Sequence, residues 1–187
     1  MRERVIFFIR YAIIQNLFSF YVTHHLVLSL IRFQESCPYL NTLSLSWCSN
    51  VSDKSIYALK KLTYLSDIDL SLTSITSKAC SILSTFKALR KLKMDATSVK
   101  GNGLSELVTG GPKAGRSYEC KLTSLSLQFL KDISYKTVGE LVSCCHDLGE
   151  LNLSYCENLD FKSYYMEHLL VKCTKRNIVL IRDGYIV

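Results

Sequence analysis

The chain repeats one short apolar pattern, L-x-x-L-x-L, five times between residues 40 and 153. The copies begin at Leu40, Leu65, Leu89, Leu122 and Leu148, and Ile68 and Met94 replace leucine in two of them. Neighbouring copies start 24 to 26 residues apart, except for the 33 residues between Leu89 and Leu122. Self-similarity at intervals of this length predicts a stack of equivalent structural units.

The register of each unit continues beyond its hexad. Three positions after the last hexad residue stands a small or apolar side chain: Cys48, Thr73, Thr97, Leu130 or Cys156. Soon afterwards comes Val51, Ile75, Val99, Ile133 or Leu159. Four units then carry an apolar pair three residues apart: Ile56 and Leu59, Cys80 and Leu83, Leu104 and Leu107, Val138 and Leu141. The fifth unit departs here, with Tyr164 and Glu167.

These spacings assign a structure to each part of the unit. Alternate residues of a strand share one face, and residues three apart share one face of a helix. Neither element can bury its apolar face alone, so stacked units share one core. Residues 37–187 are therefore predicted to form an α/β leucine-rich-repeat solenoid, a right-handed horseshoe with parallel strands on the concave face and helices on the convex face.

Two segments interrupt or close the repeats. Residues 109–119 lengthen the third unit, and their Gly, Pro and charged residues predict an exposed loop. Residues 177–183 are expected to form the strand of a final half-repeat that caps the C-terminal end. There the spacing from Cys173 places Val179 and Ile181 at the strand positions.

The repeat resembles a known family. The pattern C-x-x-L-x-x-L-x-L-S-x-C-x-x-[VIL]-[ST]-D is clearest in residues 37–53, and residues 145–160 approach it. It is similar to the cysteine-containing leucine-rich repeat of F-box/LRR proteins, which are substrate receptors of cullin-RING ubiquitin ligases. Residues 68–76, IDLSLTSIT, also resemble the F-box/LRR-like subunit of the dynein regulatory complex. Thr73, Thr97 and Leu130 depart from the family's Cys or Asn.

Residues 1–36 form a separate apolar segment. No Leu-Pro start and no Trp of an F-box occur there, so a ligase role requires an F-box from an upstream segment or from a partner. Three explanations stay open for this segment. It is a cap or degenerate first repeat, with a strand near 14–20 and a helix near 24–34; a truncated or aberrant start of the chain; or a membrane anchor over residues 11–31. Seven polar residues within 11–31 argue against the anchor.

Other classes of function find little support in the sequence. The net charge of +7 is spread along the chain, so its basic stretches predict solvated helices and loops rather than a nucleic-acid site. Several of the eight cysteines recur at fixed positions of the repeat, which favours reduced, buried side chains and a cytoplasmic or nuclear protein. No phosphate-loop, hydrolase or zinc-protease motif occurs. We therefore expect no enzyme, no metal and no cofactor.

The concave face is the predicted binding surface. Residues that flank the strand leucines should point outward there. The candidates are Ser44, Ser46, Trp47, Asp67, Asp69, Ser71, Lys91, Lys93, Asp95, Ser126, Gln128, Glu150, Asn152 and Tyr155. Aromatic side chains just past the strands are frequent hot spots. For Trp47 and Tyr155 binding and core packing both remain open, whereas core packing is favoured for Phe129.

The sequence thus predicts a protein-interaction module with a protein partner on its concave face. The resemblance implies substrate recognition in ubiquitin-dependent degradation, with cullin-RING ligase components as further partners. A structural subunit of a ciliary or cytoskeletal assembly is the first alternative. A membrane-tethered binding module is the second.

Overall fold

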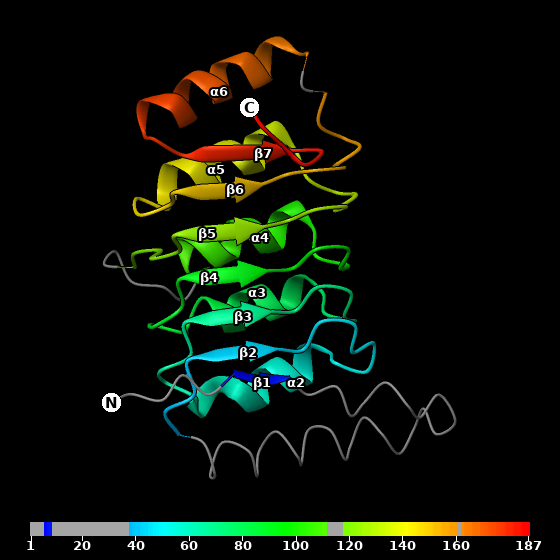
Figure 1. Cartoon of the computed structure of the whole chain (residues 1–187), viewed down its shortest axis with the longest axis vertical. Helices are drawn as coiled ribbons and strands as arrows, with labels where there is room; N and C mark the ends of the chain where they lie inside the picture. Colours follow the sequence, from blue (N-terminus) through cyan, green and yellow to red (C-terminus); the bar gives the residue numbers. More distant parts are fainter. Residues whose placement is uncertain (1–5, 9–37, 112–117, 161) are drawn as a thin grey trace.

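The computed structural model of this protein describes residues 6–8, 38–111, 118–160 and 162–187. Eight strands form one sheet in the order of the sequence, with β1 to β7 parallel and β8 antiparallel to β7. The strands are β1 (Ile6–Phe8), β2 (Thr42–Ser44), β3 (Asp67–Asp69), β4 (Lys91–Lys93), β5 (Ser124–Ser126), β6 (Glu150–Asn152), β7 (Val179–Arg182) and β8 (Tyr185–Ile186). Figure 1 shows β1 to β7 lying side by side, one after another along the length of the molecule.

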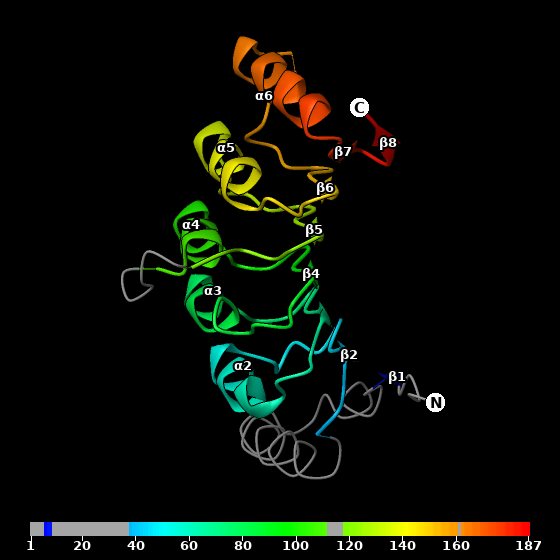
Figure 2. The same cartoon turned by 90° about the vertical axis from the view of Figure 1, so that its left-hand side faces the viewer.

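Helices follow the strands and lie together on one side of the sheet. They are α2 (Asp53–Ala58) with the 3-10 helix η2 (Leu59–Lys61), α3 (Ser77–Leu83), α4 (Gly101–Thr109), α5 (Tyr135–Cys144) and α6 (Tyr164–Lys175). Figure 2 shows the helices on one side and the sheet curving inward on the other. This is the predicted strand-loop-helix solenoid.

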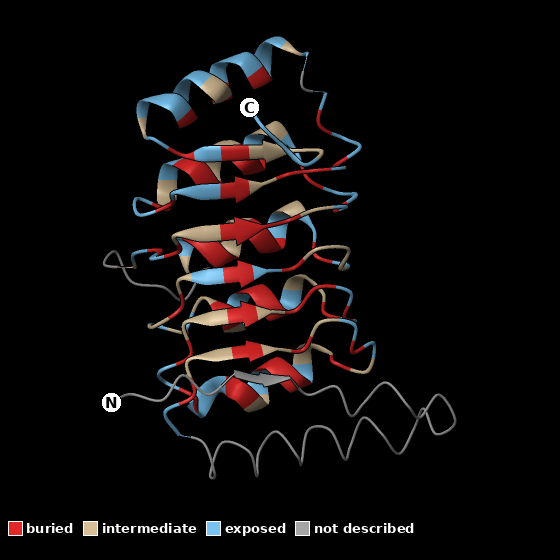
Figure 3. Ribbon diagram, viewed as in Figure 1, coloured by how far each residue is buried: buried red, intermediate tan, exposed pale blue. Residues whose placement is uncertain are grey.

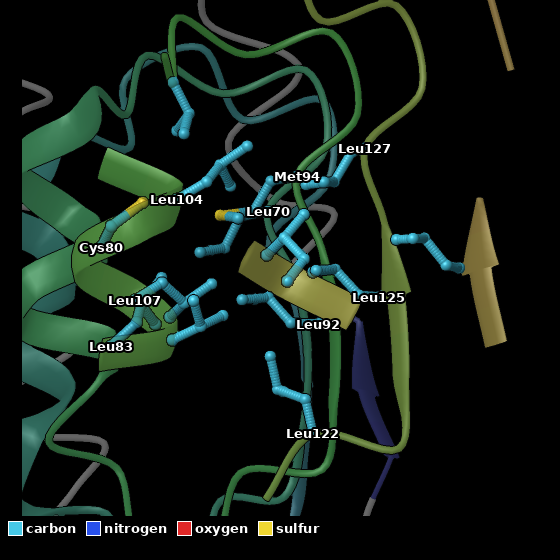
Figure 4. Packing of buried hydrophobic residues seen from close by; sticks show 14 of the residues in the cluster. Leu70, Cys80, Leu83, Leu92, Met94, Leu104, Leu107, Leu122, Leu125 and Leu127 are labelled. Atoms are coloured by element: carbon cyan, nitrogen blue, oxygen red, sulfur yellow. The ribbon is translucent and has the colours of Figure 1, made fainter. Parts of the chain in front are cut away.

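The central residue of each strand fills the shared core. Leu43, Ile68, Leu92, Leu125 and Leu151 lie in register in neighbouring strands and are at most 1% exposed. The last residues of the hexads are equally buried: Leu45, Leu70, Met94, Leu127 and Leu153. Figure 3 shows this buried stripe crossing every strand of the described repeats, and Figure 4 shows the strand leucines meeting Cys80, Leu83, Leu104 and Leu107 from the helices.

The helix positions also match the prediction in four units, where both members of each apolar pair are buried. In the fifth unit the buried face of α6 consists of Met166, Leu169 and Cys173, whereas Tyr164 and Glu167 are exposed. The loop before α6 is longer than in the other units, and α6 begins only after its N-cap Ser163. The periodicity is therefore intact but shifted by two residues.

Hydrogen bonds between neighbouring units hold the helix starts in line. The Thr76 backbone amide and hydroxyl both donate to the Asp53 carboxylate, at 2.8 and 2.7 Å. The Lys100 amide donates to Ser77 Oγ at 3.1 Å, and the Gly101 amide donates to the Asp132 carbonyl at 2.8 Å. The final Asp of the repeat pattern thus acts as a clamp from α2 onto the N-cap of α3.

The C-terminal strand differs from its predicted register. Leu151 is in register with Leu180, which is fully buried, whereas Val179 is 40% exposed and Ile181 is only partly buried. The spacing argument was wrong here because Asn177, in the left-handed region at φ 54°, shifts the register by one residue. A turn at Asp183 and Gly184, both with positive φ, then adds the antiparallel strand β8. Asp-Gly is a typical sequence for such a hairpin.

The N-terminal segment is described only at β1, which adds a parallel strand beside β2, with Phe7 opposite Leu43. The strand expected near 14–20, the helix near 24–34 and the anchor expected over 11–31 lie outside the described residues. Within the described parts of the chain, no helix has the length and apolar character needed to cross a bilayer. Most of the loop expected at 109–119 also lies outside them. It follows α4, whose C-cap Gly110 has a φ of 78°.

The described cysteines belong to the repeat core. Six of the seven are buried, and Cys144 is half-buried. Burial raises the pKa of the Cys80 thiol to about 12, with Glu106 and Asp53 adding to the effect, and burial raises the pKa of Cys156 to about 11. The sulfurs of Cys120 and Cys145 lie 2.7 Å apart in neighbouring units.

These environments predict selective labelling. At pH 8 an alkylating reagent should modify Cys144 in the native chain and leave Cys80 and Cys156 unmodified, because the thiolate is the reactive form and both thiols are buried and protonated. Mass spectrometry of the labelled peptides, with a urea-unfolded sample as reference, measures this difference. Labelling of Cys80 at equal rates in both samples would contradict the buried position.

Candidate protein-interaction surface

The concave face is the surface of the sheet that turns away from the helices. Its side chains come from the residues on either side of each buried strand leucine. Asp67 and Asp69 are half-buried on β3, and Lys91 and Lys93 are exposed on β4. Ser44 on β2 and Asn152 on β6 are half-buried, as are Ser46 just after β2 and Gln128 just after β5, whereas Glu150 is exposed.

Charge on this face changes from strand to strand. Asp67 and Asp69 lie in register with Lys91 and Lys93 on the next strand, followed by the neutral β5 and then by Glu150 on β6. Among the described residues, neither lysine amine lies within 4.0 Å of a carboxylate oxygen. Both amines are thus available to a partner.

Two of the predicted surface residues are buried instead. Ser71 and Ser126 are each 7% exposed. Asp95 covers Ser126, because its carboxylate accepts hydrogen bonds from Ser126 Oγ at 2.6 Å and from the Gln128 amide at 2.8 Å. Asp95 therefore joins the ends of β4 and β5, a role that alternation along a single strand does not reveal.

Two further candidates stabilise their own strand ends. Asp69 accepts a hydrogen bond from the Ser71 amide at 3.0 Å, and Asn152 accepts one from the Ser154 amide at 3.0 Å. These side chains are partly committed to local structure and offer a partner only their remaining lone pairs and donors.

Ser71 itself provides a stability prediction. Its hydroxyl is buried, and no hydrogen-bond partner for it exists among the described residues. An unsatisfied buried hydroxyl costs about 1–3 kcal/mol. Ser71→Ala should therefore leave the free energy of unfolding equal or raise it by up to about 1 kcal/mol, measured by urea denaturation. A loss of more than about 1 kcal/mol would mean that the hydroxyl does have a partner.

A row of apolar side chains borders the concave face just past the carboxyl ends of the strands. This rim row consists of Trp47, Leu72, Ala96, Phe129 and Tyr155. Trp47 is 69% exposed, Phe129 and Tyr155 are each 50% exposed, and Leu72 is 38% exposed. The prediction that Phe129 packs as core is wrong, because its ring stacks on Tyr155 at the surface, with ring centroids 4.6 Å apart.

Every member of the rim row has a left-handed backbone. Their φ angles lie between 52° and 66°, a region that favours glycine. Each non-glycine residue held there costs about 1–2 kcal/mol. The sequence alone gave no sign of this feature, because the turn preferences of Gly and Asn are absent at these positions. Large exposed side chains on a strained backbone lower stability without filling the core, which makes them candidates for contact with a partner.

The rim row is continuous because each amide donates to the next unit. Trp47 donates to the Ser71 carbonyl at 3.0 Å, and Leu72 donates to the Asp95 carbonyl at 2.8 Å. Ala96 and Phe129 repeat this bond with the carbonyls of Gln128 and Ser154, and Tyr155 donates to the Asp183 carboxylate. The row therefore has one side chain per unit at a fixed position.

Other hollows lie away from this face. One of about 830 Å³ lies between α3 and α4 and is lined by Phe86, Glu106 and Tyr118, among others. Another of about 440 Å³ lies between α5 and α6 and is lined by Tyr135, Tyr165 and Lys172, among others. Within the described ranges, no group of three or more His, Cys, Asp or Glu side chains is placed to hold a metal ion.

No protein-family model matches the sequence. Solved structures do share the architecture. Leiomodin-1, in a structure of its actin-binding site 2, superposes with a TM-score of 0.56 at 16% identity, over 79% of this chain and 86% of that one. The fold is a leucine-rich-repeat solenoid.

Two further leucine-rich-repeat structures agree. The tropomodulin C-terminal domain of Caenorhabditis elegans has a TM-score of 0.56 at 16% identity and covers 81% of this chain and 92% of that one. Internalin C2 of Listeria monocytogenes has a TM-score of 0.50 at 20% identity and covers 80% of this chain but 54% of that one. At these identities the likeness establishes a shared leucine-rich-repeat fold.

Proposed function

We propose that this chain is a protein-recognition module that binds its partner with the concave face and the rim row and performs no catalysis itself. The observation that carries this proposal is the rim row, in which exposed Trp47, Phe129 and Tyr155 are held on a strained backbone. Tryptophan and tyrosine are enriched among the few residues that contribute most of the binding energy at protein interfaces. A surface that alternates acidic and basic strands beside these rings can also select one partner by charge.

The specific role that we propose is substrate recognition in ubiquitin-dependent degradation, in the cytoplasm or nucleus. Its support is the cysteine-containing repeat pattern of residues 37–53 and 145–160. The described geometry gives several of the pattern positions structural tasks, such as the Asp53 clamp and the Cys156 thiol that donates to the Leu127 carbonyl at 3.2 Å. An F-box on another segment or on a partner would link the solenoid to a cullin-RING ligase.

A structural subunit of a cytoskeletal or ciliary assembly is the second candidate. It is favoured by the resemblance of residues 68–76 to the dynein regulatory complex subunit and by the similarity to an actin-binding site of leiomodin-1. A membrane-tethered binding module through residues 11–31 is a third possibility, supported only by the low charge of that segment.

Affinity purification of the tagged chain from its native cells, followed by mass spectrometry, separates these roles. Cullin, its adaptor or ubiquitinated proteins are the expected result. Dynein, actin or axonemal proteins without ligase components would contradict the ligase role and support a structural subunit. A chain lacking residues 1–36 tests the third role, since loss of membrane-fraction recovery would indicate an anchor. Absence of any partner that exceeds an untagged control would contradict the recognition role itself.

A further inference from the structure

The rim row has a repeat distance that a partner must match. Its members are joined from unit to unit by backbone hydrogen bonds, so they follow the strand separation of about 4.8 Å. Four such steps, from Trp47 to Tyr155, span roughly 19 Å. The distance of 4.6 Å between the Phe129 and Tyr155 ring centroids agrees with this spacing.

An α-helix matches this distance better than an extended strand does. A helix that lies along the row presents one apolar side chain per turn of about 5.4 Å. Over four steps, the positions of its side chains and those of the rim row therefore differ by only about 2.4 Å. A strand presents alternate residues about 6.7 Å apart on one face. Over the same four steps, the positions of its side chains and those of the rim row differ by about 7.6 Å. A mismatch of about 7.6 Å exceeds the spacing of about 4.8 Å between neighbouring units, so the side chains of an extended peptide cannot contact the rim-row residues one to one.

The charged strands beside the row determine the direction in which a bound helix runs. Along the solenoid they read acidic at Asp67 and Asp69, basic at Lys91 and Lys93, neutral on β5 and acidic at Glu150. A helix that docks on the row turns one flank towards these strands. From β3 to β6, the charges on that flank that complement the strands are basic, acidic, neutral and basic, one per turn. A helix with the first two charges exchanged would place like charges opposite each other.

We propose that the rim row is a binding site for an amphipathic α-helix of a protein partner. This helix has one apolar residue per turn, and its flank carries basic, acidic, neutral and basic residues in the order from β3 to β6. This inference rests on the proposed recognition function and makes its partner class specific. The mode is helix recognition by apolar anchors at intervals of three to four residues.

Peptide selection tests the inference without a known partner. A phage-displayed library of random 20-residue peptides is selected on the full wild-type chain and depleted on a rim-glycine variant, Trp47→Gly with Phe129→Gly and Tyr155→Gly. Circular dichroism and a cooperative thermal transition confirm that the variant is folded. Enriched peptides should carry apolar residues at intervals of three to four, gain helicity on binding and bind the variant at least tenfold more weakly.

A charge-reversed chain, with Asp67→Lys and Asp69→Lys on β3 and Lys91→Glu and Lys93→Glu on β4, provides the second arm. It keeps the rim row, and peptides selected on it should show the first two flank charges in reversed order. Period-two apolar patterns, equal binding to the rim-glycine variant, unchanged charge order or no enrichment would each overturn the inference. The recognition function would still stand if cellular partners were captured by the wild-type chain, so failure of the two ideas can be told apart.

Discussion

Leu125→Asp is expected to unfold the solenoid, whereas Ser124→Asp, one residue earlier on the same strand, should leave it folded. Leu125 is fully buried between Leu92 and Leu151 of the neighbouring strands. The substitution removes about 1.5–3 kcal/mol of burial and leaves an unpaired charge in the core, worth a further 3–5 kcal/mol. Their sum approaches the whole stability of a typical domain, about 5–15 kcal/mol.

Ser124→Asp is the matched control because it introduces the same side chain on the opposite face of β5. Ser124 is half-buried and lies between Lys91 and Glu150, whose opposite charges nearly cancel for an added carboxylate. We expect a change within about 1 kcal/mol. Thermal denaturation followed by circular dichroism measures both variants, and equal losses would show that the strand register is wrong.

Gly103→Ala should destabilise the chain although alanine is the better helix former. A Cβ atom at Gly103 would lie 2.6 Å from Ser77 Cβ and 2.7 Å from Ser77 Cα, so the backbone of α3 would have to move away from α4. Overpacking of this kind costs about 1–3 kcal/mol, which exceeds the roughly 1 kcal/mol gained in helix propensity. We expect a lower free energy of unfolding in urea titrations.

Gly139→Ala provides the opposite case in the next helix. A Cβ atom there meets nothing within 4 Å, so only the propensity gain remains. This variant should be more stable by about 0.5–1 kcal/mol, or roughly 1–4 °C in Tm. If Gly103→Ala were as stable as Gly139→Ala, the close approach of α3 and α4 would be incorrect.

The repeat spacing was sufficient to predict most of the fold because each unit repeats the same physical problem. Period two fixed the buried residue of β2 to β6, and the pairs three apart fixed the buried face of α2 to α5. The repeat spacing did not locate the buried residues where the units differ. The longer loop before α6 moved its buried face to Met166, and the left-handed Asn177 moved β7 by one residue.

The candidate surface was predictable only in outline. Alternation along a strand placed Lys91 and Lys93 on the exposed face, which the structure confirms. It could not show that Asp95 covers Ser126, because that contact joins residues 31 positions apart. Nor could it show the exposed Phe129, because exposure there follows from a positive φ that Gly or Asn normally signals.

The most direct test of the binding surface is to measure both the stability and the partner capture of one variant, Trp47→Gly. Relief of the left-handed backbone, about 1–2 kcal/mol, outweighs the flexibility added by glycine, about 0.5–1 kcal/mol, and the 69% exposed ring contributes little packing. We predict an equal or higher Tm together with an at least tenfold loss of captured partner. A lower Tm with undiminished capture would contradict the account and make Trp47 part of the core.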